Sequence, residues 1–309
     1  MSAMTCSPPV LCDGTPAGIT PLPAGVFPAG PALALADQGR ISRLRWALSD
    51  VRVLTWRTLA RIATTPEQLL NVTVQPLVFV LLFSYVFGDA ITIPGHGNYR
   101  DYLIAGVVAV NMGGTAQGAA IGLAVDLSTG LVDRFRSLPM ARSAVLLGRT
   151  VADWIQNLFV LLIMALCGVA VGWRIHDGFW RALAAFLLVM LFAYAMSWVG
   201  AVIGLTVSTP ETANTAGFIW LFPVTFISNV FVPTQSLPGW LQPVAEWNPI
   251  SSTVLALREL FGNPTGFPPG GLPDVLPMQH PEWVSPLWSL LILAVFVPIA
   301  VRKYRSVSR

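Results

Sequence analysis

The sequence predicts an all-α integral membrane protein with six transmembrane helices. Charged residues make up only 11% of the 309 positions and hydrophobic residues 54%, whereas soluble proteins carry about 25% charged residues. Apolar runs of about 20 residues, the length that spans a bilayer as a helix, recur along the chain. The basic residues lie near the ends of those runs, and the net charge is only +3. This composition excludes a globular enzyme with one buried core and gives no indication of nucleic-acid binding.

The chain begins with a stretch that does not look like a membrane segment. Residues 1–39 are rich in Pro, Gly and Ala and contain no Lys or Arg. A secretory signal starts with a basic segment, so we interpret this stretch as a disordered cytoplasmic tail. Residues 40–64 alternate between apolar and arginine-bearing helical faces and include Trp46 and Trp56. We expect an amphipathic helix lying in the membrane interface, with an ordinary surface helix as the alternative.

The transmembrane domain is expected over residues 65–303, followed by a cytoplasmic tail of 304–309. The six apolar runs that predict its spans cover residues 69–87, 101–125, 151–172, 182–205, 215–233 and 284–301. Several runs carry glycines at every fourth position, such as Gly114, Gly118 and Gly122, and Gly200 and Gly204. Small residues at this spacing allow helix backbones to approach closely in lipid, which indicates a packed bundle.

The basic residues predict the orientation of the chain. A cytoplasmic N-terminus places fourteen of the 18 Lys and Arg residues on the cytoplasmic side. Only Arg100, Arg174, Arg181 and Arg258 are then outside. Cytoplasmic loops carry an excess of Lys and Arg, so both termini are predicted to be cytoplasmic.

The segment before the last span does not fit a simple span or loop. Residues 234–262 mix apolar and polar side chains around the pair Asn248-Pro249. Two half-helices broken at this pair are expected, because a proline interrupts a helix and breaks at membrane depth are tolerated where protein buries them. Residues 263–283 hold six prolines and are expected to form an irregular outer loop.

The polar connector between the second and third spans is the other unusual feature. Asp133, Arg134 and Arg136 form a charged cluster, and Pro139 ends the helix that carries them. A solvated connector would explain this composition. A docking element for a second protein is the alternative.

Three segments carry a resemblance to a known family. They are Val132–Ser143 (VDRFRSLPMARS) followed by Gly148–Asp153 (GRTVAD), then Phe222–Pro233 (FPVTFISNVFVP) and Asn248–Arg258 (NPISSTVLALR). In this order among six apolar runs, they resemble ABC-2 type transporter permeases, and most of all the daunorubicin/doxorubicin-resistance branch of drug exporters. The resemblance covers residues 40–305 and leaves the N-terminal tail outside.

This resemblance implies partners and a functional loop. It implies a permease that pairs with a cytosolic ABC ATPase subunit and forms a homodimer, or a heterodimer with a related permease, in the cell membrane. It also implies re-entrant helices over residues 234–262. The residues expected to contact the ATPase are Asp133, Arg134, Phe135, Arg136, Leu138, Pro139 and Arg142.

The chain lacks the motifs of several enzyme classes. A phosphate-binding P-loop needs Gly-x-x-x-x-Gly-Lys-Ser/Thr, and the only lysine, Lys303, is followed by Tyr304. Any ATP is therefore expected to be bound by the partner subunit, with no cofactor in this chain. His96, His176 and His280 are isolated from one another, and the three cysteines show no metal spacing. We expect neither a metal site nor a catalytic site.

The polar residues inside the predicted spans are neutral. Asn111, Gln117 and Asn229 are the candidates for a translocation path, because their spans also contain Gly or Pro. Interhelical hydrogen bonding is the alternative role for such residues. A proton-coupled transporter usually needs a charged residue near the middle of a span, and none is predicted here. An exporter of an amphipathic drug, secondary metabolite or lipid is favoured over an ABC-2 permease for polysaccharide, an ion-coupled secondary transporter or a membrane-embedded enzyme.

Overall fold

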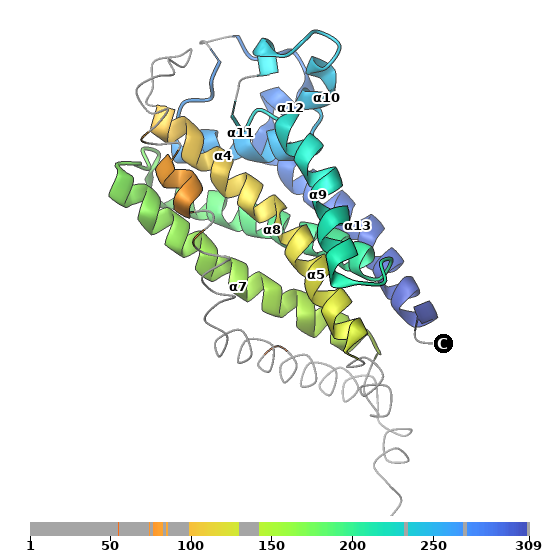
Figure 1. The fold of residues 1–309 in the computed structure, drawn as a ribbon. Coiled ribbons are helices and arrows are strands. Elements are labelled where there is room, and N and C mark those ends of the chain that lie inside the picture. The colour runs from red at the N-terminus through yellow and green to blue at the C-terminus, as the bar shows by residue number, and fades with distance from the viewer. Residues whose placement is uncertain are drawn as a thin grey trace, which may run out of the picture. The chain divides into compact units, whose positions relative to one another are not determined.

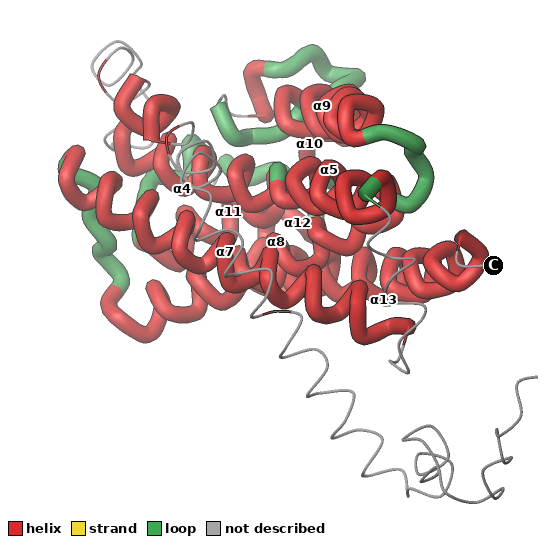
Figure 2. Tube along the Cα trace, turned by 60° about the horizontal axis from the view of Figure 1, so that its bottom comes forward, coloured by secondary structure: helices red, strands yellow, loops and turns green. Residues whose placement is uncertain are grey.

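The computed structural model describes residues 99–129, 142–231, 234–267 and 271–307, together with residues 55, 74, 77–82 and 85. Within these residues every regular element is a helix and none is a strand (Figure 2). The predicted all-α class is thus confirmed for the described part of the chain. The tail of 1–39, almost all of the predicted interfacial helix and the centre of the polar connector lie outside it.

Four stretches of the described residues are long and apolar enough to cross a membrane. They are formed by α4 (Tyr99–Gly113) together with α5 (Thr115–Ser128), by α7 (Arg142–Val171), by α8 (Gly178–Gly204) and by α13 (Pro281–Val307). They coincide with the predicted second, third, fourth and sixth spans. In Figure 1 α4 leads directly into α5, with the change of helix at Gly114.

The other two predicted spans, the first and the fifth, are not among these four stretches. The first, 69–87, lies largely outside the described residues, although 77–82 are helical. The fifth, 215–233, corresponds to α9 (Pro210–Phe226), a helix of 17 residues. It begins earlier than expected because Thr209 caps it, accepting a hydrogen bond from the Thr212 amide, and Pro210 occupies the first turn.

Helix α8 is the centre of the helical bundle. It packs against α4, α5, α7, α9, α11 and α13, and its close contact with α5 depends on two glycines. A Cβ atom on Gly200 would lie 2.0 Å from the Ala116 carbonyl oxygen, and one on Gly204 would lie 2.6 Å from that of Ala120. The prediction that these glycines allow close helix packing is confirmed.

The segment 234–262 breaks at the predicted pair. A turn of 3-10 helix, η1 (Thr234–Ser236), and the five-residue α10 (Gln242–Glu246) precede α11 (Pro249–Phe261). Asn248 caps α11 by accepting from the Ile250 amide at 2.9 Å, and Gly262 ends it at φ 69°. The first half is therefore much shorter than expected. A short α12 (Leu276–Gln279) follows before α13.

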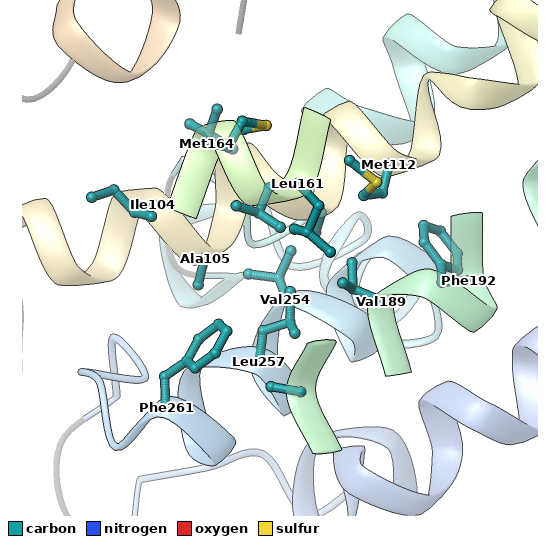
Figure 3. Close-up of a cluster of buried hydrophobic side chains, with 14 of the residues drawn as sticks. Ile104, Ala105, Met112, Leu161, Met164, Val189, Phe192, Val254, Leu257 and Phe261 are labelled. Carbon is teal, nitrogen blue, oxygen red and sulfur yellow. The ribbon is translucent and has the colours of Figure 1, made fainter. Parts of the chain in front are cut away.

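Helix α11 is inserted among the long helices instead of lying on them. Almost all of its residues are buried, and it packs against α4, α8 and α13. Figure 3 shows Val254, Leu257 and Phe261 of α11 in one apolar cluster with side chains of α4, α7 and α8. Because this core joins residues about 150 positions apart in sequence, α11 holds the bundle together at this end.

The outer faces of α7 and α13 are apolar and exposed. Phe159 and Leu166 of α7 and Leu287 of α13 are more than half exposed. Large apolar faces of this kind are unfavourable in water and favourable in lipid. We interpret these two faces as lipid-facing surface.

Candidate functional site

Three charged side chains meet where α5 and α7 approach the polar connector. Arg149 of α7 donates to the Asp126 carboxylate of α5 at 2.5 Å and to the Asp153 carboxylate of its own helix at 3.3 Å. All three side chains are largely buried, at 14–18% exposed. Both carboxylates lie near the ends of the predicted second and third spans, and both pair with Arg149.

Gly122 provides the space for this cluster. Arg149 Nη1 also donates to the Gly122 carbonyl oxygen at 3.2 Å. A Cβ atom on Gly122 would lie 1.6 Å from Arg149 Nη2, whereas one on Gly118, one turn earlier, would meet no atom of the described residues within 4 Å. The regularly spaced glycines of α5 therefore differ in role: Gly122 accommodates a guanidinium group, and Gly118 makes no close contact with the described helices.

Most of the residues predicted to contact an ATPase lie in the sequence between α5 and α7. Asp133, Arg134, Phe135, Arg136, Leu138 and Pro139 are outside the described residues. Arg142, the last of the set, is the first residue of α7. The charged cluster is thus close in sequence to both ends of this stretch, at the end of α5 and in the early turns of α7.

The three candidates for a translocation path have different environments. Asn111 on α4 is partly buried. Gln117 on α5 donates through Nε2 to the Asn214 side-chain oxygen of α9, so it links two helices. Asn229, in the turn after α9, is completely buried, and its side-chain amide makes no hydrogen bond to the described residues. Gln117 thus bonds across helices, whereas Asn229 lies in the protein interior.

An exposed aromatic row lies next to the Gln117–Asn214 pair on α9. Phe218, Phe222 and Phe226 follow Asn214 at intervals of four residues, so they share one helix face. Their ring centroids are 5.3 Å and 4.3 Å apart in succession, and each side chain is about half exposed. This face combines a polar end with a continuous aromatic surface.

Arg258 is an important residue whose surroundings the sequence did not indicate. It was expected on the outer side of the membrane, and its side chain is completely buried on α11. It donates to the carbonyl oxygens of Tyr102 at 3.1 Å, Asn229 at 3.0 Å and Val230 at 2.9 Å. Its guanidinium carbon lies 3.4 Å from the centre of the Tyr102 ring, a cation–π contact. The available signal was an arginine, followed by Glu259, in the otherwise apolar run 254–261.

The contacts of Arg258 and Tyr102, called here the Arg258 network, connect residues 229 and 230, which follow α9, to α4 and α11. The Tyr102 hydroxyl also donates to the Asn229 carbonyl at 3.0 Å. Carbonyl groups just past a helix end have no partner within the helix, and a cation is favourable there. Arg258 is therefore satisfied by carbonyl oxygens and a ring, without any carboxylate among its described contacts. Gly106 allows this approach, because a Cβ there would lie 2.8 Å from the Val230 oxygen.

Comparison with known proteins establishes the family. Residues 49–261 match the family described as ABC-2 type transporter. The chain belongs to this family. The match includes the polar connector, the charged cluster and the Arg258 network. The permease is therefore a multi-pass membrane protein, as its apolar helices already indicate.

Individual relatives of this ABC-2 permease include proteins named for drug resistance. It is 31% identical over 305 residues to the daunorubicin resistance ABC transporter permease protein DrrB1 of Streptomyces coeruleorubidus, covering 98% of this chain and 99% of the relative. It is 26% identical over 271 residues to the probable doxorubicin resistance ABC transporter permease protein DrrC of Mycobacterium tuberculosis, covering 87% and 93%. A putative transport permease, ycf38, of Cyanophora paradoxa is 22% identical over 223 residues, covering 70% and 75%. The resemblance to the drug-exporter branch is confirmed.

Proposed function

We propose that this ABC-2 permease is the membrane subunit of an exporter that moves an amphipathic drug, secondary metabolite or lipid out of the cell. The observation that carries the proposal is the 31% identity to a daunorubicin resistance permease over nearly the whole of both chains. The exposed aromatic row on α9 supports it, because neighbouring aromatic rings offer a binding surface to flat apolar compounds. Export of polysaccharide is the alternative within the same family.

The energy for export is proposed to come from ATP hydrolysis by a separate ATPase chain. A P-loop requires a lysine after a glycine-rich segment, and the only lysine here is Lys303, near the end of α13. ABC permeases work with an ATPase partner, and the relatives' names mark them as ABC permeases. An ion-coupled mechanism is the weaker alternative. The described spans hold charged residues only toward their ends, and a proton relay usually needs one near the middle.

The polar connector is proposed to contact this ATPase. Phe135 and Leu138 are assigned to an apolar groove on the ATPase, and Arg134 and Arg136 to its acidic rim. Asp133, Pro139 and Arg142 complete the contact stretch. An apolar anchor surrounded by charged groups is the usual anatomy of a protein interface.

Phe135→Ala is expected to weaken association with the ATPase and to abolish export, while Arg136→Ala has a milder, salt-sensitive effect. Truncating a buried aromatic anchor costs about 2 kcal/mol or more, and a rim charge contributes much less. Co-purification of the ATPase with each variant measures the association, and membrane levels of the permease provide the control. Wild-type ATPase binding and export by Phe135→Ala would favour the solvated-connector interpretation.

The proposed topology has six spans and both termini in the cytoplasm. The N-terminal tail of 1–39 and the interfacial helix of 40–64 precede the transmembrane domain of 65–303, and a tail of 304–309 follows. Residues 234–262, with α11 buried in the bundle, are proposed to enter from outside as re-entrant helices. Two permease chains are proposed to form the transport unit, as a homodimer or with a related permease.

Cysteines introduced at Ser137 and Thr265 are expected to react with a membrane-impermeant reagent from opposite sides. Fourteen of the 18 basic residues lie on the proposed cytoplasmic side, which strongly favours this orientation. The measurement uses right-side-out and inside-out vesicles, in a variant lacking Cys6, Cys12 and Cys167. Reaction of both sites from the same side would contradict the topology.

The translocation path is proposed to run along the face of α9 that begins at the Gln117–Asn214 pair. Asn111 lies on α4, the helix before α5, and is retained as a candidate for the path. Asn229 is proposed to contribute only if the buried turn after α9 opens, since its amide is enclosed in the described structure.

An assay of ATP-driven export tests the function itself. Inside-out vesicles containing the permease and its proposed ABC ATPase subunit are expected to accumulate a fluorescent anthracycline when ATP is added. Vesicles with an ATPase whose P-loop lysine is replaced are the matched control. Accumulation driven by a proton gradient, without ATP, would favour the secondary-transporter alternative.

A further inference from the structure

Arg149 has two carboxylate partners that differ in one important respect. Asp126 lies on another helix, 23 residues earlier, so this pair exists only while α5 and α7 are in contact. Asp153 lies one turn later on α7 itself. It therefore stays within reach of Arg149 however α7 moves relative to α5.

The burial of the cluster makes the second partner important. The side chains are only 14–18% exposed, and a buried charge that loses all its partners is strongly destabilised. Asp153 can also accept a further hydrogen bond, because its Oδ2 is buried and makes no hydrogen bond to the described residues. A guanidinium that leaves Asp126 can occupy both oxygens of Asp153 in a bidentate pair.

We propose that Asp126 and Arg149 form a latch between the two spans that flank the ATPase-facing stretch, and that Asp153 holds Arg149 when the latch opens. This inference rests on the proposed function. Asp126 lies two residues before the end of α5, and Arg149 lies in the second turn of α7. A displacement of residues 129–141 by an ATPase acts first on these two helix ends. All three residues are positioning residues, because they act through the helices and not on the substrate.

Two variants open the latch by different routes. Asp126→Asn removes the interhelical charge. Gly122→Ala keeps every charge but places a methyl group where Arg149 Nη2 lies, 1.6 Å from the ideal Cβ position. Gly118→Ala is the matched control, since the same change one turn earlier meets none of the described residues within 4 Å. Asp153→Asn removes the holding partner and leaves the latch charge in place.

The experiment measures coupling and helix separation in the same preparations. Coupling is the ATP hydrolysed per anthracycline exported, in vesicles containing the permease and its ATPase. Separation is the distance distribution between spin labels at Ser128 and Leu147, which are exposed on α5 and α7, in a variant without native cysteines. ATPase co-purification and membrane levels are recorded for every variant.

Asp126→Asn and Gly122→Ala are expected to retain the ATPase, to raise the ATP consumed per molecule exported by about tenfold and to add a longer label distance. A charge-assisted hydrogen bond is worth about that factor in an equilibrium. Asp153→Asn is expected to keep only the short distance and to slow export, because the open state then leaves Arg149 without a carboxylate partner. Gly118→Ala should match the wild type in every measurement.

Two results would overturn the latch. One is a label distance and a coupling ratio in Asp126→Asn and Gly122→Ala equal to those of Gly118→Ala. The other is loss of both variants from the membrane, which would make the cluster a structural ion pair. Failure of the proposed function is distinguishable, because wild-type vesicles would then show no ATP-driven export even where the label distances respond to the substitutions.

Discussion

Replacing Arg258 by methionine is expected to destabilise the permease by about 3 kcal/mol or more. The substitution removes the guanidinium donor from the carbonyl oxygens of Tyr102, Asn229 and Val230, and the Asn229 oxygen keeps only the Tyr102 hydroxyl as a side-chain donor. Unsatisfied buried acceptors cost about 1–3 kcal/mol each, and hydrogen bonds from a charged donor are at the upper end. The contact with the Tyr102 ring is lost as well. Methionine fills most of the volume of the arginine side chain, so the stability is lost mainly through the missing hydrogen bonds.

The thermal midpoint of the purified protein in detergent measures this effect. Arg258→Lys is expected to restore only part of the stability, because one ammonium group cannot reproduce the planar fork that reaches three carbonyls. Arg181→Met is the control, since Arg181 makes an exposed ion pair with Asp177 and such pairs contribute about 0–1 kcal/mol. Equal midpoints for Arg258→Met and Arg181→Met would show that the buried network does not stabilise the fold.

Gly200→Ala is expected to separate α8 from α5 and to destabilise the bundle by up to about 3 kcal/mol. The added methyl group would lie 2.0 Å from the Ala116 carbonyl oxygen and 2.7 Å from its carbonyl carbon. These are backbone atoms of a helix, so no side-chain rotation relieves the overlap. Overpacking a close-packed interior costs about 1–3 kcal/mol, and α8 is the helix on which most others pack. Export should be lost together with stability.

Gly118→Ala provides the matched control for this prediction. Both substitutions replace a helical glycine and gain about 1 kcal/mol of helix propensity, but a methyl group at Gly118 meets no atom of the described part of the chain within 4 Å. The thermal midpoint should therefore fall for Gly200→Ala and stay level or rise for Gly118→Ala. A higher thermal midpoint for both variants would mean that α5 and α8 are not in backbone contact.

The candidate site was only partly accessible to sequence reasoning. The family motifs directed attention to the connector between α5 and α7, and the cluster of Asp126, Arg149 and Asp153 lies where that connector joins the helices. The cluster itself was missed, because the Asp126–Arg149 pair depends on how two helices pack. The role of Phe135 and its neighbours stays a prediction, since these residues are outside the described part of the chain.

The sequence by itself determined the helical class, four of the spans and the break at Asn248-Pro249. Each of these depends on local chemistry. Hydropathy over about 20 residues decides whether a segment can span a bilayer, and a proline with a capping asparagine decides where α11 begins. The family likewise followed from short ordered motifs, and the matched residues 49–261 confirm it.

Only the tertiary structure decided the role of the charged and small residues. Arg258 was counted only as one of the four basic residues expected on the outer side, whereas its side chain is enclosed by α4 and the segment after α9. Gly118, Gly122 and Gly200 share one sequence pattern, yet they face open space, a guanidinium group and a helix backbone respectively. The physical reason is that burial and pairing energies depend on which distant segments meet, and helical periodicity specifies a face without specifying its neighbour.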